Sequence, residues 1–235
     1  MHAALQAVAR CPRPQWSRLA VLRPLGRNLV QNPCWIEDFR HLSVQCKFPG
    51  WNGGWNAGWN AGWKVEEYLG AEDQTCFASS SKWCQKEQVI DLLKEGFWLD
   101  LLDTYQPDIV VSDWWSGFQD YGCEYELYVA LLAANKKRTV GVFEAKRNPR
   151  LLSMVPSYQK VTHTFRQYGP GVRYILFRHR GKDTQFWKGH YGARVTNSSM
   201  VIQFSSESAE SPEPGLSSAP TSQLPSPVLP PKSYF

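Results

Sequence analysis

Two aromatic and polar clusters are the strongest candidates for chemistry in this sequence of 235 residues. One is residues 113–123, Asp-Trp-Trp-Ser-Gly-Phe-Gln-Asp-Tyr-Gly-Cys, and the other is residues 182–192, Lys-Asp-Thr-Gln-Phe-Trp-Lys-Gly-His-Tyr-Gly. An indole beside a carboxylate and an ammonium suits a carbohydrate, because sugar C–H groups stack on the ring and the charges bind hydroxyls and acetamides. The alternative is that these tryptophans anchor a hydrophobic core, and the composition favours neither.

Sequence patterns of common enzymes and metal sites are missing. The five histidines show no H-x-x-x-H or H-E-x-x-H spacing, and the six cysteines show no C-x-x-C pair. G-x-S-x-G, P-loop and dinucleotide patterns are also missing. Asp113, Asp120 and Asp183 could supply a carboxylate pair, although most such aspartates are turn residues. We therefore expect no metal and no cofactor.

The charge distribution gives no reason to expect a nucleic-acid partner. The chain has 26 Lys plus Arg against 21 Asp plus Glu, and its first 36 residues hold five arginines and no acid. The remainder is neutral, so the overall excess says nothing about its partners. No apolar run reaches the length of about 18 residues that a membrane helix needs. A secretory signal is not visible, so we expect a cytoplasmic protein with reduced cysteines; a mitochondrial presequence is the alternative.

Composition divides the chain into three parts. Residues 1–21 are expected to form a basic arm, residues 22–204 one domain, and residues 205–235 a disordered tail rich in proline and serine. Residues 50–63, GWNGGWNAGWNAGW, form a four-residue repeat that favours an expanded loop over a tryptophan platform for ligands. In the tail, Pro227–Lys232 fits the P-x-x-P-x-basic pattern that SH3 domains bind, although such matches are common in biased sequence.

Most of the domain has the patterns of β-strands. Residues 86–103 are the exception: Val89, Leu93 and Phe97 fall four apart, which predicts a helical stretch that Gly96 divides. Apolar and polar residues alternate over 124–131, and strands are also expected at 108–112, 161–166, 172–176 and 200–204. Many strands with one helical segment predict a mostly β protein, an antiparallel β-sandwich.

Several motifs in order resemble the F-box-associated (FBA) domain of the sugar-recognising F-box proteins. The likeness extends from Arg23 to Phe204, about four-fifths of the chain. The motifs are PLGRNLVQNPC at 24–34, QVIDLLKEG at 88–96, PDIVVSDW at 107–114, YGPGVRY at 168–174, DTQFWKG at 183–189 and GARVTNSS at 192–199.

The resemblance implies a galactose-binding-domain-like jelly roll with a short helical segment. It also implies binding of the two innermost N-acetylglucosamine units of N-glycans on misfolded glycoproteins, which an SCF-type ubiquitin ligase then modifies. The implied sugar site is Asp120, Phe186, Trp187 and Lys188, with the indole of Trp187 on a sugar face. Asp120 and Lys188 would hold polar groups, and Phe186 would line an apolar pocket. Because other subunits transfer the ubiquitin, the resemblance also implies that the domain itself is not an enzyme.

Three departures from the family pattern bear on function. Ser81 stands where sugar-binding members carry an aromatic wall of the pocket, and His190 stands where they carry tryptophan. An F-box needs about 40–50 residues ahead of the domain, comparable to the smallest domains, and only about twenty precede Arg23. We therefore expect the ligase adaptor as a partner only if an F-box lies upstream. The alternative is a protein-interaction module that lacks the ligase link and has weakened sugar binding.

Overall fold

A computed structural model describes residues 6, 8–9, 11, 13–31, 33, 64–67, 75–118, 122–148, 158–185 and 189–204. The tryptophan repeat and the tail predicted from composition lie outside these residues. The part of the chain that is described holds no helix long and apolar enough to cross a membrane.

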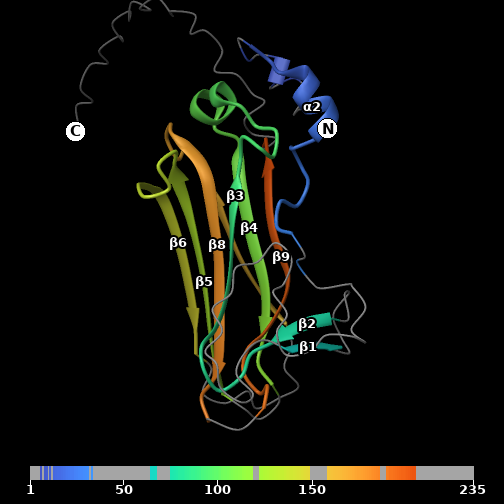
Figure 1. Ribbon diagram of the computed structural model, residues 1–235, viewed down its shortest axis with the longest axis vertical. Coiled ribbons are helices and arrows are strands. Elements are labelled where there is room, and N and C mark those ends of the chain that lie inside the picture. The colour runs from blue at the N-terminus through green and yellow to red at the C-terminus, as the bar shows by residue number, and fades with distance from the viewer. Residues whose placement is uncertain are drawn as a thin grey trace, which may run out of the picture.

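Two antiparallel sheets pack face to face, as the sequence predicts (Figure 1). The five-stranded sheet has the order β1-β2-β9-β4-β7, and the four-stranded sheet has the order β3-β8-β5-β6. The first sheet contains β1 (Lys64–Glu67), β2 (Thr75–Ala78), β9 (Arg194–Gln203), β4 (Asp108–Ser116) and β7 (Gln159–Phe165). The second contains β3 (Cys84–Asp91), β8 (Val172–Asp183), β5 (Cys123–Ala133) and β6 (Thr139–Arg147).

The core lies between the sheets and follows the period of two that a strand imposes. In β5, every second residue from Tyr125 to Leu131 is buried, which confirms the predicted alternation. In β8, Val172 is buried as expected, but Tyr174 and Leu176 face outward and Ile175 and Phe177 fill the core. An irregularity between β5 and β8 near Leu132 shifts this phase.

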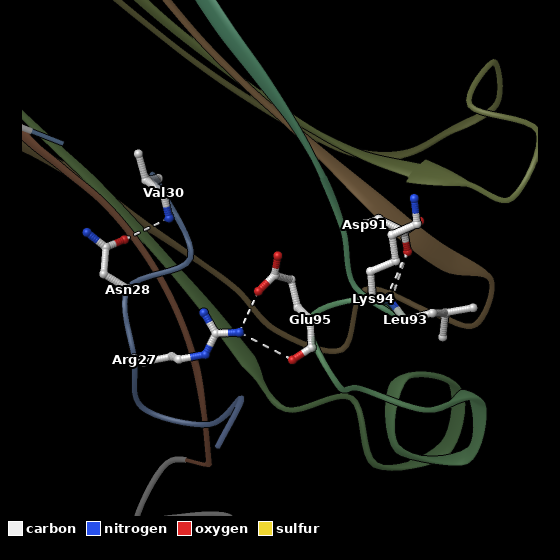
Figure 2. A network of polar contacts seen from close by, with 7 residues as sticks. All are labelled: Arg27, Asn28, Val30, Asp91, Leu93, Lys94 and Glu95. Atoms are coloured by element: carbon white, nitrogen blue, oxygen red, sulfur yellow. Dashed lines mark hydrogen bonds and ion pairs between the residues drawn. The ribbon is translucent and has the colours of Figure 1, made fainter. Parts of the chain in front are cut away.

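The helix predicted over residues 86–103 is wrong in its first half. Cys84–Asp91 is strand β3, which pairs with β8 over eight residues, and Val89 is 42% exposed. The Asp91 carboxylate accepts bonds from the backbone N–H groups of Leu93 and Lys94, so the strand ends in a turn (Figure 2). Gly96, at φ +108°, separates this turn from a short π-helix, η2 (Leu101–Tyr105).

Part of the predicted basic arm packs on the domain. Val8 and Cys11 are buried in the core cluster, and helix α2 (Trp16–Leu22) lies beside the segment before η2. There the Arg18 guanidinium donates to the carbonyl of Phe97 at 3.1 Å. This end of the chain therefore contributes to the fold, whereas the predicted boundary at residue 21 stays a prediction.

Residues 24–31 of the motif at 24–34 run along β9 and join it to β3. The Asn28 side chain accepts bonds from the N–H groups of Val30 and Met200 and donates to the carbonyl of Ser198, all at 3.0 Å. Beyond it, the side-chain amide of Gln88 bonds both backbone groups of Gln31. Arg27 forms an ion pair with the Glu95 carboxylate and donates to the backbone carbonyl of Glu95 at 3.3 Å (Figure 2). These bonds connect the N-terminal segment to both sheets, and we call residues 24–31 the clasp.

Candidate functional site

Three connecting segments meet at the end of the sandwich opposite α2 (Figure 1). They link β2 to β3, β4 to β5, and β8 to β9. The N–H of Asp183 donates to the carbonyl of Ser80 at 2.9 Å, and the N–H of Gly192 donates to that of Ser79 at 3.0 Å. The N–H of Thr184 donates to the carbonyl of Gly122 at 3.0 Å. The bases of the three loops therefore form one hydrogen-bonded platform, which we call the loop end.

Glycines permit this close approach. A Cβ on Gly192 would lie 2.7 Å from the backbone nitrogen of Asp183 and would also strike the Ser79 hydroxyl. A Cβ on Gly181 would lie 2.8 Å from the Cβ of Ala193. Contacts this short are repulsive, so only glycine fits at either position without moving a neighbouring segment.

Aromatic rings and a buried cation support the loop end from below. Phe118 packs on Tyr191 with ring centroids 5.4 Å apart, and the guanidinium carbon of Arg194 lies 4.2 Å from the Phe118 centroid. Arg194 is 1% exposed and donates to the carbonyls of Gly192 and His190 at 3.4 and 3.5 Å. The cation therefore joins the start of β9 to both flanking loops.

The residues of the predicted sugar site lie outside the described residues. These are Asp120, Phe186, Trp187 and Lys188, and their roles stay predictions. The structure does describe residues close to them in sequence. Gly122, two residues after Asp120, accepts a hydrogen bond from Thr184, two residues before Phe186. Ser81 is half-buried in the first loop, next to Ser80, whose carbonyl accepts from Asp183. Ser81, where the sequence departs from the family pattern, therefore lies at the loop end.

Of the three candidate aspartates, Asp113 and Asp183 are among the described residues, and both are buried. Asp183 is fully buried at the end of β8, and its Oδ1 accepts from the N–H of Gln185 at 3.0 Å, as in a turn. Asp113 is not a turn residue: it lies within β4, at an irregularity in the pairing with β9 that spans Ser112 and Trp114. Such a bulge re-aims a side chain, and here the carboxylate points into the interior.

Asp113 is the centre of a buried polar network that the sequence motifs did not reveal. Its Oδ2 accepts from the Tyr125 hydroxyl at 2.7 Å and lies 2.9 Å from Nδ1 of His179, and its Oδ1 accepts from the Ser198 hydroxyl at 2.8 Å. All four side chains are buried. Because a carboxylate only accepts, Nδ1 of His179 carries the proton.

Burial sets the protonation of this interior. It lowers the pKa of His179 despite the opposing Asp113 carboxylate, so the imidazole is neutral. It also lowers the pKa of Lys86, which is fully buried against the Phe77 ring, and it raises the pKa of the Tyr125 hydroxyl. A network closed off from solvent in this way holds the sheets in register and has no access for a substrate.

His179 and Lys86 could have been found from the strand period. His179 falls in phase with Ile175 and Phe177, and Lys86 falls in phase with Ile90. A polar residue at a core position of an alternating strand is a sign of a buried network. The sequence analysis placed Tyr174 and Leu176 on the inner face of β8 and predicted a helix in place of β3. It therefore did not recognise these two polar core positions.

Comparison with known sequences identifies the family. The model of the F-box associated region matches residues 20–202. The chain is 44% identical over 193 residues to F-box only protein 27 of Mus musculus, covering 82% of this chain and 65% of that protein. It is 42% identical over 192 residues to F-box only protein 2 of Bos taurus, covering 81% and 64%.

Solved structures with a similar fold include TmCBM61 in complex with β-1,4-galactotriose, at a TM-score of 0.44 and 11% identity, covering 75% of this chain and 99% of that one. Another is a family 16 carbohydrate binding module, at a TM-score of 0.39 and 14% identity, covering 74% and 99%. The chain spans about 65% of the length of the F-box only proteins that it matches. It belongs to the F-box associated family.

Proposed function

We propose that this chain is a substrate-recognition module of an SCF-type ubiquitin ligase pathway that binds the N-glycan core of misfolded glycoproteins. Its setting would be glycoprotein quality control in the cytoplasm. Membership of the F-box associated family supports the proposal. The observation that carries it is the loop end, where hydrogen bonds between Asp183 and Ser80 and between Thr184 and Gly122 hold together the bases of the loops that contain the candidate sugar residues.

The proposed role of the loop end is binding alone. The indole of Trp187 stacks on a sugar face, Phe186 lines an apolar pocket, and Asp120 and Lys188 bind hydroxyl and acetamide groups. Ubiquitin transfer belongs to other subunits, and a ligase adaptor joins only through an F-box ahead of the domain. The hydrogen-bonded bases of the loops, with Arg194 buried under Phe118, are pre-organised, which reduces the entropy lost on binding.

The test is glycan binding by the purified chain and its Trp187→Ala variant. The ligand is a denatured glycoprotein with high-mannose glycans, and the same protein after enzymatic removal of those glycans is the negative ligand. We expect Trp187→Ala to lose about tenfold in affinity, the value of one aromatic contact. Trp16→Ala is the matched control, because Trp16 is 45% exposed on α2 at the opposite end. Equal binding by both variants, or no binding by the wild type, would refute the proposal.

Ser81 favours a second candidate function, a protein-interaction module that has weakened sugar binding and no ligase link. The serine leaves the loop end without the aromatic wall that the family resemblance implies. If the pocket otherwise exists, Ser81→Phe should raise glycan affinity about fivefold or more, since one aromatic contact contributes about 1–3 kcal/mol. If Ser81→Phe gains nothing and the wild type does not bind, the second function holds.

A further inference from the structure

The outward face of the four-stranded sheet carries a polar depression close to the loop end. It has a volume of about 170 Å³ and lies over the middle strands, β8 and β5, and the edge strand β6. Six side chains form most of its lining: Arg178, Arg180, Glu126, Tyr128, Glu144 and Lys146. The strand pairing sets them in two rows across the sheet, with Arg180 opposite Glu126 and Arg178 opposite Tyr128.

Stacking and ion pairs fix the charged groups of this depression. Arg180 Nε donates to Oε2 of Glu126 at 2.7 Å, and Nη2 forms an ion pair with the same oxygen. The Arg180 guanidinium lies 4.3 Å from the ring of Trp83. The guanidinium of Arg178 lies 4.5 Å from the ring of Tyr128. The ring faces that these cations cover are not available to a sugar, so the depression favours a charged ligand over a neutral saccharide.

Arg178 forms no ion pair among the described residues. Glu87 lies opposite it on β3 but accepts a bond from Gln85, Glu126 binds Arg180, and Glu144 lies 4.0 Å from Lys146. Its contact with Tyr128 pre-orients the planar guanidinium, which matches a carboxylate in two parallel hydrogen bonds. The free charge therefore favours a ligand that carries a carboxylate.

An apolar strip borders the depression on the side away from the loop end. Val89, Leu176, Ala130 and Val142 stand in one row across all four strands, two residues further along than Arg178. Ala130 is fully buried, so Val89, Leu176 and Val142 form the accessible part of the strip. Val89 is 42% exposed and Val142 is 47% exposed. Two residues of a strand span about 7 Å, so one ligand can reach both the strip and Arg178. An acidic sugar would leave the strip uncovered, whereas a peptide with aliphatic side chains would cover it.

We propose that this face binds an extended peptide segment in which a glutamate or aspartate carboxylate meets Arg178 and neighbouring aliphatic side chains cover the strip. The site goes beyond the proposed glycan function and does not depend on it. Glu126 and Glu144 on the rim would repel a peptide with several acidic residues side by side, so a single carboxylate among aliphatic residues is the preferred sequence.

The experiment measures fluorescence anisotropy of labelled ten-residue peptides with the full chain. One peptide carries a central glutamate among leucine and valine; the second has glutamine in its place, and the third keeps glutamate among serines. We expect the first to bind about tenfold more tightly than the other two, and Arg178→Gln to lose a similar factor, as for a charged hydrogen bond. The losses from Arg178→Gln and from the glutamine peptide should not add, because they remove the same contact.

Two controls keep the result specific. Lys160→Gln removes a cation that lies 5.6 Å from the ring of Trp114 on the other sheet, and Val21→Asp alters a residue that is 79% exposed on α2; neither should change binding. Val142→Asp should weaken it. Circular dichroism verifies that each variant is folded. Equal affinity for the glutamate and glutamine peptides, or binding unchanged in Arg178→Gln, would overturn the proposal. So would binding of sialyllactose that depends on Arg178 while no peptide binds.

Discussion

The Asp113 carboxylate and the His179 imidazole lie 2.9 Å apart in the interior of the sandwich, and both side chains are fully buried. Asp113 comes from β4 of one sheet and His179 from β8 of the other. Their contact is therefore a polar tie between the two layers. Unlike an apolar contact, it tolerates only one relative position of the sheets, because the donors and acceptor must meet.

Asp113→Asn should destabilise the domain. The amide has one acceptor oxygen and presents N–H groups toward donors, so at least one of the bonds to Tyr125, His179 and Ser198 is lost. We expect the free energy of unfolding to fall by about 3 kcal/mol, and Tm to fall by about 6–12 °C, in thermal unfolding followed by circular dichroism. Glu144→Gln, at an exposed site, is the control and should change stability by less than about 0.5 kcal/mol. A similar Tm for both variants would mean that the network contributes nothing.

His179 should make stability depend on mildly acidic pH. Burial lowers its pKa below the ordinary value of 6.5, so below about pH 6.5 the unfolded chain binds a proton that the native state does not. The free energy of unfolding therefore falls as the pH falls from about 6.5 toward the native pKa. His179→Asn keeps a donor for Asp113 and cannot titrate, so urea unfolding at about pH 7 and pH 5 should show a smaller loss in the variant.

His163 also has a pKa lowered by burial, but it is present in both proteins, so the difference between them isolates His179. Parallel pH profiles for wild type and His179→Asn would contradict the assignment of a neutral, buried imidazole.

Asn28→Ala should loosen the clasp between the N-terminal segment and β9. The change removes bonds to Val30, Met200 and Ser198. We expect a loss of about 2 kcal/mol and faster trypsin cleavage after Arg27. Asn135→Ala is a matched control, because Asn135 also accepts from two backbone N–H groups at 3.0 Å, but in an exposed turn. If both variants resist trypsin equally, the clasp does not hold the segment.

Gly192→Ala should disturb the loop end. The added methyl group would press on the Ser79 hydroxyl and the Asp183 nitrogen, which would force β9 away from its neighbours at a cost of about 1–3 kcal/mol. Glycan affinity should fall with it, since the loop bases separate. Gly141→Ala, whose nearest contact would be an ordinary 3.4 Å to Leu131, is the control. Normal Tm and normal glycan binding in Gly192→Ala would show that the loop end tolerates displacement.

The sequence predicted the sandwich because most strands show the alternation that half-buried strands require. Strand β5 is the clearest case, with Tyr125, Leu127 and Val129 inward and Glu124 and Glu126 outward. Strand β3 was missed because two of its inward positions are polar. Lys86 and Gln88 face the interior, where Gln88 bonds the backbone of Gln31, so the apolar residues alone show no period of two.

The candidate site depended on the family resemblance more than on local patterns. Composition marked the clusters at 113–123 and 182–192, but the bonds that join their bases run between residues distant in sequence, such as Thr184 and Gly122. No local pattern encodes such a pairing. The two ends of the first cluster also lie in different parts of the molecule. Asp113 lies in the interior, and Gly122 lies at the loop end.

The bond from the Gly26 N–H to the Ile202 carbonyl brings the start and the finish of the domain to one pole of the molecule, while the loops gather at the other. Strand β9 runs between the poles, and its ten residues span about 30 Å. The sandwich is thus a stiff spacer. Under the proposed function, a module joined to the chain at the first pole would be held at a fixed distance from a ligand bound at the loop end. Lengthening the junction between them, without altering the loops, would therefore change how a bound protein is presented.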